Sequence, residues 1–188
     1  MKSALACALL VACGHGGDAA RDPAEPEPLD GTRLVVTSTA FTAGGAIPID
    51  HTCEGVDLAP DLAWSGAPPT TKSFAIIVDD PDAPDPSAPK QTWVHWVLVG
   101  IPATVTSLPA GAGVTPPQGA ANGKNDFGKL AWGGPCPPAG THRYFFKVFA
   151  LDLALAQPGI TKPELLAAMK GHVVARGELM GRYKKRPR

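Results

Sequence analysis

Apolar runs of strand length, separated by loops rich in glycine and proline, set the pattern of this chain from Arg33 to Leu151. The runs are rich in β-branched and aromatic residues, which favour pleated strands. Glycine and proline number 21 each among the 188 residues, so turns are frequent. We therefore predict a mainly β fold, a two-sheet antiparallel sandwich with one or two short C-terminal helices. The predicted strands cover residues 34–39, 62–64, 73–78, 93–101 and 143–151.

A helix is predicted after the last of these runs, because residues 161–164 have the form of a capping box. Thr161 is followed three residues later by Glu164, and a proline occupies the first turn. An apolar face follows at helical spacing, and Gly171 is placed to end the helix. Residues 173–180 are predicted to form a second short helix.

The first twelve residues are typical of an export signal rather than of a folded domain. Lys2 gives a positive start, and the apolar run from Ala4 to Ala12 is too short to span a bilayer. Residues 10–13, Leu-Val-Ala-Cys, resemble a bacterial lipobox, in which Cys13 is lipidated. The alternative is an ordinary secretory signal that is cleaved nearby.

A tether is predicted after Cys13, because residues 14–30 are polar and rich in proline and offer little apolar surface for packing. We divide the chain into a lipoprotein-type signal peptide (1–12), a lipidated cysteine with a disordered tether (13–31) and one domain (32–188). We expect a cell-envelope lipoprotein at the outer membrane, facing the periplasm, because no aspartate follows Cys13. A secreted or periplasmic protein is the alternative.

Two cysteines, Cys53 and Cys136, fall inside the predicted domain. An exported chain meets an oxidising compartment, so this pair could form a disulfide. Two buried free thiols are the alternative. A metal site is less well supported, because neither cysteine has a second one at two-residue spacing.

Two segments place acidic and aromatic groups at the ends of predicted strands. Residues 79–84 read Asp-Asp-Pro-Asp-Ala-Pro, and the prolines hold Asp80 and Asp82 in a fixed relation, although such acids often only cap a turn. Strand alternation puts Trp93 and His95 on one face and Trp96 on the other. A histidine in such a strand is more often a core residue, but the aromatic neighbour favours a pocket wall.

A third segment, residues 133–144, reads Gly-Gly-Pro-Cys-Pro-Pro-Ala-Gly-Thr-His-Arg-Tyr. Its two glycines allow close approach of the backbone, and its prolines stiffen the loop. Alternation then places His142 and Tyr144 on one face of the strand that follows. The backbone N–H groups near Gly133 and Gly134 could form an anion-binding nest.

Taken together, these three segments resemble the phosphatidylethanolamine-binding protein (PEBP) family, in its bacterial and archaeal Raf kinase inhibitor-like branch. The Asp-Pro-Asp-Ala-Pro turn, the Trp-x-His strand and the Gly-Pro-x-Pro-Pro segment with its later His-Arg-Tyr occur in the family's order. The resemblance extends from Leu34 to Tyr183. Further matching pieces are residues 46–48, 52–55, 125–128 and 177–183. The chain departs from the pattern at Gly100, where many relatives carry asparagine, and in the proline-rich loop 83–90.

The resemblance implies a two-sheet β fold with a small cavity that accepts phosphate-like anions and phospholipid headgroups. Carried over to this chain, the ligand-binding residues are Asp80, Asp82, Trp93, His95, Pro135, Pro137, His142 and Tyr144. We expect the two aspartates to accept hydrogen bonds from histidine N–H groups, since carboxylates repel a phosphate. Cationic His95 and His142 would then donate to the anion, and its affinity would fall as the pH rises.

The resemblance implies non-catalytic binding of small anionic or phosphoryl ligands, with no catalytic residues, no cofactor and no metal. A protease- or kinase-type inhibitor or another interaction module is the alternative, with an unknown protein partner. A homodimer and a membrane contact through the lipid anchor are further expectations. A metal-dependent hydrolase has less support, because no dense ligand motif such as His-Glu-x-x-His occurs. The formal net charge of zero argues against a nucleic-acid partner.

Overall fold

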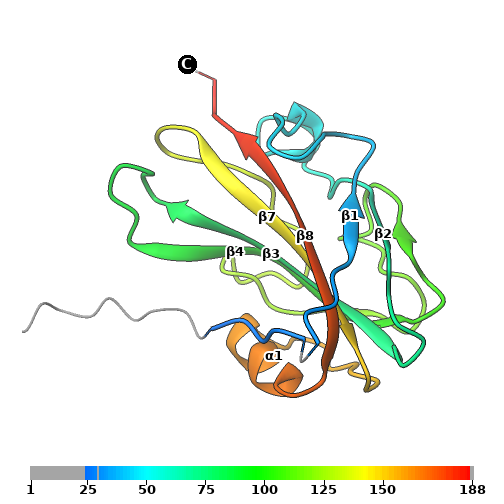
Figure 1. Cartoon of the computed structure of the whole chain (residues 1–188). Coiled ribbons are helices and arrows are strands. Elements are labelled where there is room, and N and C mark those ends of the chain that lie inside the picture. The colour runs from blue at the N-terminus through cyan, green and yellow to red at the C-terminus, as the bar shows by residue number, and fades with distance from the viewer. Residues whose placement is uncertain (1–23, 29, 187–188) are drawn as a thin grey trace, which may run out of the picture.

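The computed structural model describes residues 24–28 and 30–186 of the chain. The predicted signal peptide (1–12), Cys13 and the first part of the tether therefore lie outside the described residues. The described residues form two antiparallel sheets and one α-helix, arranged in three layers (Figure 1). The predicted mainly β fold is thus confirmed. No helix among the described residues has both the length and the apolar character needed to cross a bilayer.

The large sheet provides the central layer and has the strand order β6-β4-β3-β7-β8. Its strands are β3 (Ser73–Ala83), β4 (Gln91–Pro102), β6 (Ala121–Asn122), β7 (His142–Leu151) and β8 (Val173–Tyr183). The small sheet has the order β1-β2-β5 and covers one face of the large sheet. Its strands are β1 (Val35–Thr37), β2 (Leu62–Ser65) and β5 (Ser107–Leu108), and a 3-10 turn, η1, covers Ile49–His51.

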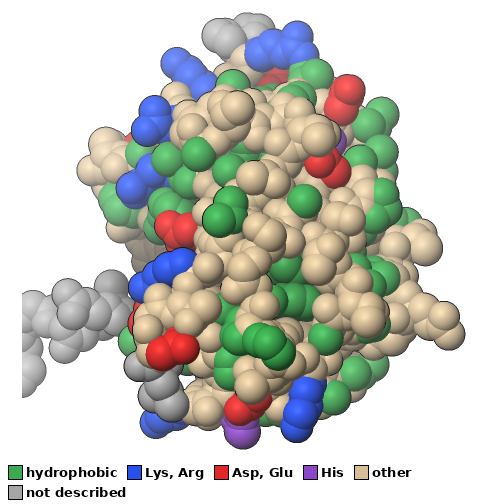
Figure 2. All heavy atoms as spheres, turned by 45° about the vertical axis from the view of Figure 1, so that its right-hand side comes forward, with side chains coloured by type: hydrophobic (Ala, Val, Ile, Leu, Met, Phe, Trp, Pro, Cys, Tyr) green, Lys and Arg blue, Asp and Glu red, His purple; other side chains and the backbone are tan. Residues whose placement is uncertain are grey.

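Strand alternation divides the buried side chains of the large sheet between two apolar cores. On β3, Phe74, Ile76 and Val78 face the small sheet, whereas Ala75 and Ile77 face α1 (Lys162–Met169). The same division continues along β4 and β7, so these central strands are covered on both faces, whereas the edge strand β8 buries mainly the side chains that face the small sheet. Figure 2 shows the side of the molecule over the small sheet, where charged side chains lie mainly at the margins of the view.

The predicted helix is confirmed as α1. The backbone N–H of Thr161 donates to Oε2 of Glu164 at 2.8 Å, which completes the capping box. Leu165 lies fully buried against the large sheet, because the helix presents its apolar side to β3 and β4. Gly171 follows with a φ of +80°, a conformation that glycine adopts without steric cost.

The second predicted helix, at residues 173–180, is wrong, because these residues belong to β8. Val173, Ala175 and Leu179 alternate with more exposed residues and pack in the cores. Gly177 takes one of the alternating inward positions, where a Cβ atom would lie 2.3 Å from the carbonyl oxygen of Leu34. Because Gly177 has no apolar side chain at this buried position, the alternation of apolar and polar residues that is typical of a strand is interrupted in the sequence.

Candidate functional site

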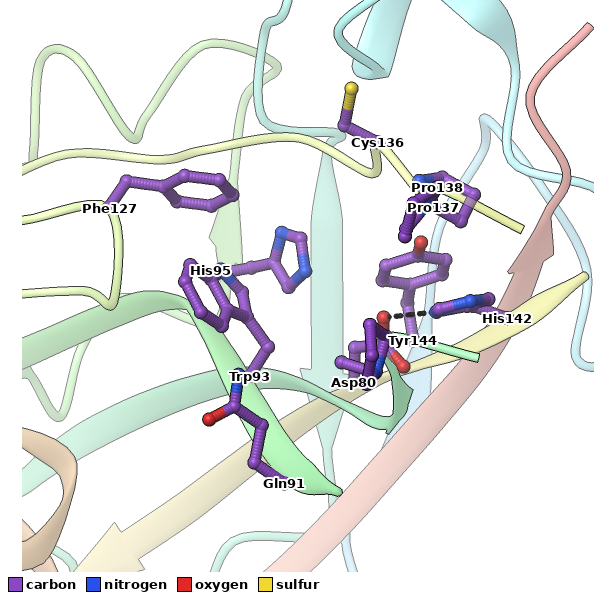
Figure 3. Close-up of a pocket in the computed structure, with 12 residues that line it drawn as sticks. Asp80, Gln91, Trp93, His95, Phe127, Cys136, Pro137, Pro138, His142 and Tyr144 are labelled. Atoms are coloured by element: carbon purple, nitrogen blue, oxygen red, sulfur yellow. Dashed lines mark hydrogen bonds and ion pairs between the residues drawn. The ribbon is translucent and has the colours of Figure 1, made fainter. Parts of the chain in front are cut away.

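One cavity of about 220 Å³ opens where β3, β4 and β7 meet the loops that carry Phe127 and Cys136 (Figure 3). Six of the eight predicted ligand-binding residues line it: Asp80, Trp93, His95, Pro137, His142 and Tyr144. The structure therefore confirms that Trp93 shares a face with His95, and that His142 shares a face with Tyr144. The lining is mostly apolar, so each polar group in it has few hydrogen-bond partners among the other lining side chains.

Asp80 and His142 form a buried pair across β3 and β7. Nδ1 of His142 lies 2.7 Å from Oδ2 of Asp80, and the exposed fractions of the two side chains are 1% and 4%. Nε2 of His142 lies 2.9 Å from the carbonyl oxygen of Ala139, which can only accept a hydrogen bond. Nε2 therefore carries a proton, and one further proton lies between Nδ1 and Asp80. Burial raises the pKa of Asp80, and the hydrogen bond to His142 opposes that rise.

His95 is held as a neutral ring. Its Nδ1 lies 2.5 Å from the carbonyl oxygen of Gly133, so Nδ1 is the nitrogen that carries the proton. Burial lowers the pKa of His95 to about 4, because the interior disfavours the charged ring. Nε2 is then a hydrogen-bond acceptor. The expectation that cationic His95 donates to an anion is wrong, and His142 has both nitrogens engaged by protein oxygens.

Two buried donors at the cavity have no hydrogen-bond partner among the described residues: the hydroxyl of Tyr144 and Nε1 of Trp93. Burial raises the pKa of Tyr144, so its hydroxyl keeps its proton and can donate. Figure 3 shows this hydroxyl directed toward Pro137 and Pro138 at the cavity wall. The ring of His95 stands edge-on to Tyr144, with 5.1 Å between their centroids.

Asp82 and Pro135 do not line the cavity. Asp82 accepts hydrogen bonds from Arg143 instead, at 2.9 Å from Nε and 2.6 Å from Nη2. The guanidinium lowers the pKa of Asp82 and keeps the carboxylate charged. The predicted role of Asp82 in orienting a histidine is therefore wrong, because its carboxylate is paired with Arg143 instead. The carbonyl oxygen of Pro135 accepts from the N–H of Cys53 at 3.1 Å.

The two glycines of the third segment serve close packing rather than an anion nest. The N–H of Gly133 donates to the carbonyl oxygen of His95 at 3.1 Å, and that of Gly134 donates to Oδ1 of Asp57 at 2.8 Å. A Cβ atom at Gly134 would lie 2.2 Å from the same Asp57 oxygen. Both N–H groups are therefore occupied by the protein, which overturns the expected nest.

A disulfide joins Cys53 to Cys136 with a Cα–Cα distance of 5.4 Å, so the alternative of two free thiols is excluded. Cys136 belongs to the loop that forms one wall of the cavity, and Cys53 follows η1. The bond ties this wall to the segment after η1 at a sequence separation of 83 residues. It therefore connects the cavity wall to a distant part of the chain.

Several wall residues were not predicted. Phe127 contacts both Trp93 and His95, with ring centroids 5.4 Å apart in each case. It lies in the matching segment 125–128, but nothing in its local pattern predicts a cavity. The predicted opposite placement of Trp96 is also wrong. A register shift opposite residues 94–96 interrupts the alternation, so Trp96 and His95 both contact Trp132. The remaining unpredicted lining residues are Ala83, Pro84, Gln91, Cys136 and Pro138.

Comparison with known proteins agrees with this architecture. Residues 37–184 match the family model described as phosphatidylethanolamine-binding protein. A UPF0098 protein of Methanothermobacter thermautotrophicus is 45% identical over 150 residues, which cover 78% of this chain and 95% of that protein. The crystal structure of CT736, a PEBP homolog from Chlamydia trachomatis, has a TM-score of 0.74 at 39% identity and covers 82% of this chain and 99% of its own. Escherichia coli YbcL, described as a member of the mammalian PEBP family, also has a TM-score of 0.74, at 38% identity and the same coverage. The chain belongs to the phosphatidylethanolamine-binding protein family.

Proposed function

We propose that the cavity binds the phosphoryl group of a small ligand without changing it chemically. The observation that carries this proposal is the buried hydroxyl of Tyr144, which has no partner among the described residues beside a largely apolar cavity. An unpaired buried hydroxyl costs on the order of 1 to 3 kcal/mol. A ligand oxygen that accepts from Tyr144 recovers this free energy, and that gain favours the bound state.

The hydrogen-bonding groups of the cavity match a phosphoryl group that keeps one proton. Tyr144 and Trp93 supply donors, and neutral His95 supplies an acceptor. Oδ1 of Asp80 accepts from the N–H of Asp82 at 2.8 Å and has a second lone pair for a further donor. A hydrogen phosphate ester has two or more oxygens that accept and one hydroxyl that donates. A fully deprotonated or sulfate group lacks the donor and would leave an acceptor unpaired.

Asp80 does not repel an anion as a free carboxylate would. One proton is shared between Asp80 and His142. Whether it lies on the carboxyl group or on the imidazole ring, the net charge of the pair is zero. Arg143 likewise balances the charge of Asp82. The local charge at the cavity is thus close to neutral, and hydrogen bonds rather than net charge select the ligand.

The same contacts support binding rather than catalysis. Both nitrogens of His142 are engaged by protein oxygens, so of the two cavity histidines only His95 has a nitrogen, Nε2, that can reach a substrate proton. Burial lowers the pKa of His95 to about 4, which makes this nitrogen a weak general base. Cys136 is bonded to Cys53 and cannot act as a nucleophile in this state. We also propose, from residues 10–13 of the sequence, that a lipid on Cys13 holds the domain at the cell envelope.

Isothermal titration calorimetry with phosphoethanolamine and with O-sulfoethanolamine tests the proposed ligand class. The two compounds share an ammonium group and differ in the proton that the phosphoryl group retains near pH 6. We expect saturable binding of the phosphoryl compound, with about tenfold weaker binding of the sulfate. Tyr183 provides the matched control, because it is the second of the two tyrosines and its hydroxyl donates to Glu54. Equal binding by wild type and Tyr144→Phe would exclude the cavity as the site.

A further inference from the structure

A second cavity, with a polar lining, lies on the α1 side of the large sheet, on the opposite face from the first cavity. Its lining includes Asp79, Lys147 and Lys162 of the domain together with Glu25 of the N-terminal segment. Asp79 and Lys147 occupy positions on β3 and β7 that alternate with those of Asp80 and Tyr144. The two cavities therefore share two strands, although each uses a different set of side chains.

Asp79 is the buried centre of this second site. Its side chain is 1% exposed, and it receives two lysine ammonium groups. Nζ of Lys162 lies 2.8 Å from Oδ2, and Nζ of Lys147 lies 2.8 Å from Oδ1. One carboxylate thus contacts two cations, and Glu25 adds a second carboxylate to Lys147. The side chain of Lys147 is only 12% exposed, so the ion pair between Lys147 and Glu25 is shielded from water on most sides.

Arg176 of β8 extends the site along the sheet. Its guanidinium lies 5.5 Å from the centroid of the Phe149 ring, which supports it on one side. Nη2 donates to Oε2 of Glu25 at 3.0 Å, and Nη1 donates to Oε1 of Glu27 at 2.5 Å. Arg33 adds a contact to Oε2 of Glu27 at 2.7 Å. The spacing of Glu25 and Glu27 thus fits one planar guanidinium.

Burial distinguishes the two glutamates. The side chain of Glu25 is 17% exposed and that of Glu27 is 54% exposed, so Glu25 carries the more shielded contacts.

Pro28 is buried, and the backbone beyond it runs beside β8, where the N–H of Leu34 donates to the carbonyl oxygen of Arg176 at 2.8 Å. In Figure 1 the segment lies beside α1 and β8 before the chain enters β1.

We propose that Lys147 and Arg176 form a binding site for the carboxylates of an extended Glu-Pro-Glu segment, and that residues 24–28 of the same chain occupy this site as an exchangeable strap. The strap then holds residues 24–28 against the α1 side of the domain. Prolines at positions 26 and 28 restrict the backbone and lower the entropy that is lost on docking. An acidic peptide of the same pattern competes for the site when the strap is released.

Backbone amide relaxation measured by NMR on the full chain tests the docking of the strap. The steady-state heteronuclear NOE of the Glu25 and Glu27 amides should match that of the domain at low salt. In Glu25→Gln, and in wild type at about 1 M NaCl where charges are strongly screened, both values should fall to those of a flexible linker. Glu178→Gln is the matched control, because it removes a carboxylate 3.8 Å from Arg176 that belongs to β8 rather than to the strap. Mobile Glu25 in wild type, or an ordered strap in Glu25→Gln, would overturn the proposal.

A second experiment tests the site itself. The Glu25→Gln/Glu27→Gln variant leaves the cations in place, so an acetylated Ala-Glu-Pro-Glu-Pro peptide should cause saturable shifts in the resonances of Lys147 and Arg176. A peptide with glutamine in place of both glutamates should bind at least tenfold more weakly. The double variant alters no fully buried side chain, so we expect the fold to be retained, and an unchanged remainder of the spectrum verifies that it is. Equal shifts from both peptides, or none from either, would show that the site does not select carboxylates.

Discussion

Nδ1 of His142 and Oδ2 of Asp80 lie 2.7 Å apart, on two neighbouring strands that bury both groups almost completely. The second nitrogen of the same ring donates to Ala139, so His142 has no N–H left for a ligand. Its role is to hold Asp80 and the 139–142 segment in place at the cavity wall. In the complex that we propose, the ligand instead contacts Tyr144, Trp93 and the unprotonated edge of His95.

Replacing Tyr144 by phenylalanine should have opposite effects on stability and on binding. The substitution removes a buried hydroxyl without a partner among the described residues, so the free energy of unfolding should rise by about 1 kcal/mol. Affinity for a phosphoryl ligand should fall about tenfold, because the donor is lost. Urea unfolding and calorimetry measure the two effects. Tyr183→Phe should leave the affinity unchanged, and a loss of stability in Tyr144→Phe would contradict the assignment.

Replacing Asp80 by alanine should destabilise the fold by about 2 to 3 kcal/mol. Nδ1 of His142 and the backbone N–H of Asp82 both lose their partner at Asp80, and a cationic His142 would be buried without a counter-charge. Asp85→Ala is the control, because Asp85 is a nearby carboxylate whose bonds to Ser87 are exposed. We expect a change within about 0.5 kcal/mol for the control. Similar urea midpoints for the two variants would argue against a buried pair.

His95 should make stability depend on pH between about 4 and 6.5, the range between its folded and ordinary pKa values. In this range the unfolded chain binds one more proton than the folded chain, so the free energy of unfolding rises with pH. The rise should total about 3 kcal/mol and should be complete near pH 7. His95→Gln should remove this slope, whereas His172→Gln, which changes an exposed histidine, should retain it. A slope that persists in His95→Gln would assign it to another group.

Reduction of the Cys53–Cys136 disulfide should cost about 2 to 5 kcal/mol of stability, because it closes a long loop. Both cysteines are exposed, so a reductant has direct access to the bond. The loop at Cys136 also forms a cavity wall, and affinity for the phosphoryl ligand should fall with reduction. Calorimetry at a temperature where the reduced protein remains folded separates the two effects. Unchanged affinity there would show that the wall holds its position without the bond.

The strands and the aromatic side of the cavity could be predicted because they depend on local periodicity. Trp93 with His95 and His142 with Tyr144 each share a face through simple alternation, and both pairs line the cavity. The α1 capping box is equally local, since its donors and acceptors lie within three residues. Each of these features needs no knowledge of how distant segments meet.

The protonation pattern and the partners of the acidic residues could not be predicted, because they depend on contacts between distant segments. Asp82 pairs with Arg143 across 61 positions, and His95 donates to Gly133 across 38. Trp96 departs from alternation because the register shift depends on the pairing of β3 with β4. Glu25 lies in a segment whose composition is typical of a tether, although its contacts include Lys147, 122 residues away.

Asp79 and Asp80 are consecutive residues of β3 whose side chains enter cavities on opposite faces of one sheet. If docking of the strap and binding of the phosphoryl ligand each favour a particular placement of β3, the two binding events are thermodynamically linked. The factor by which the seated strap changes ligand affinity must equal the factor by which the ligand changes strap docking. A displaced N-terminal segment would then report, on one side of the domain, whether the cavity on the other side is filled.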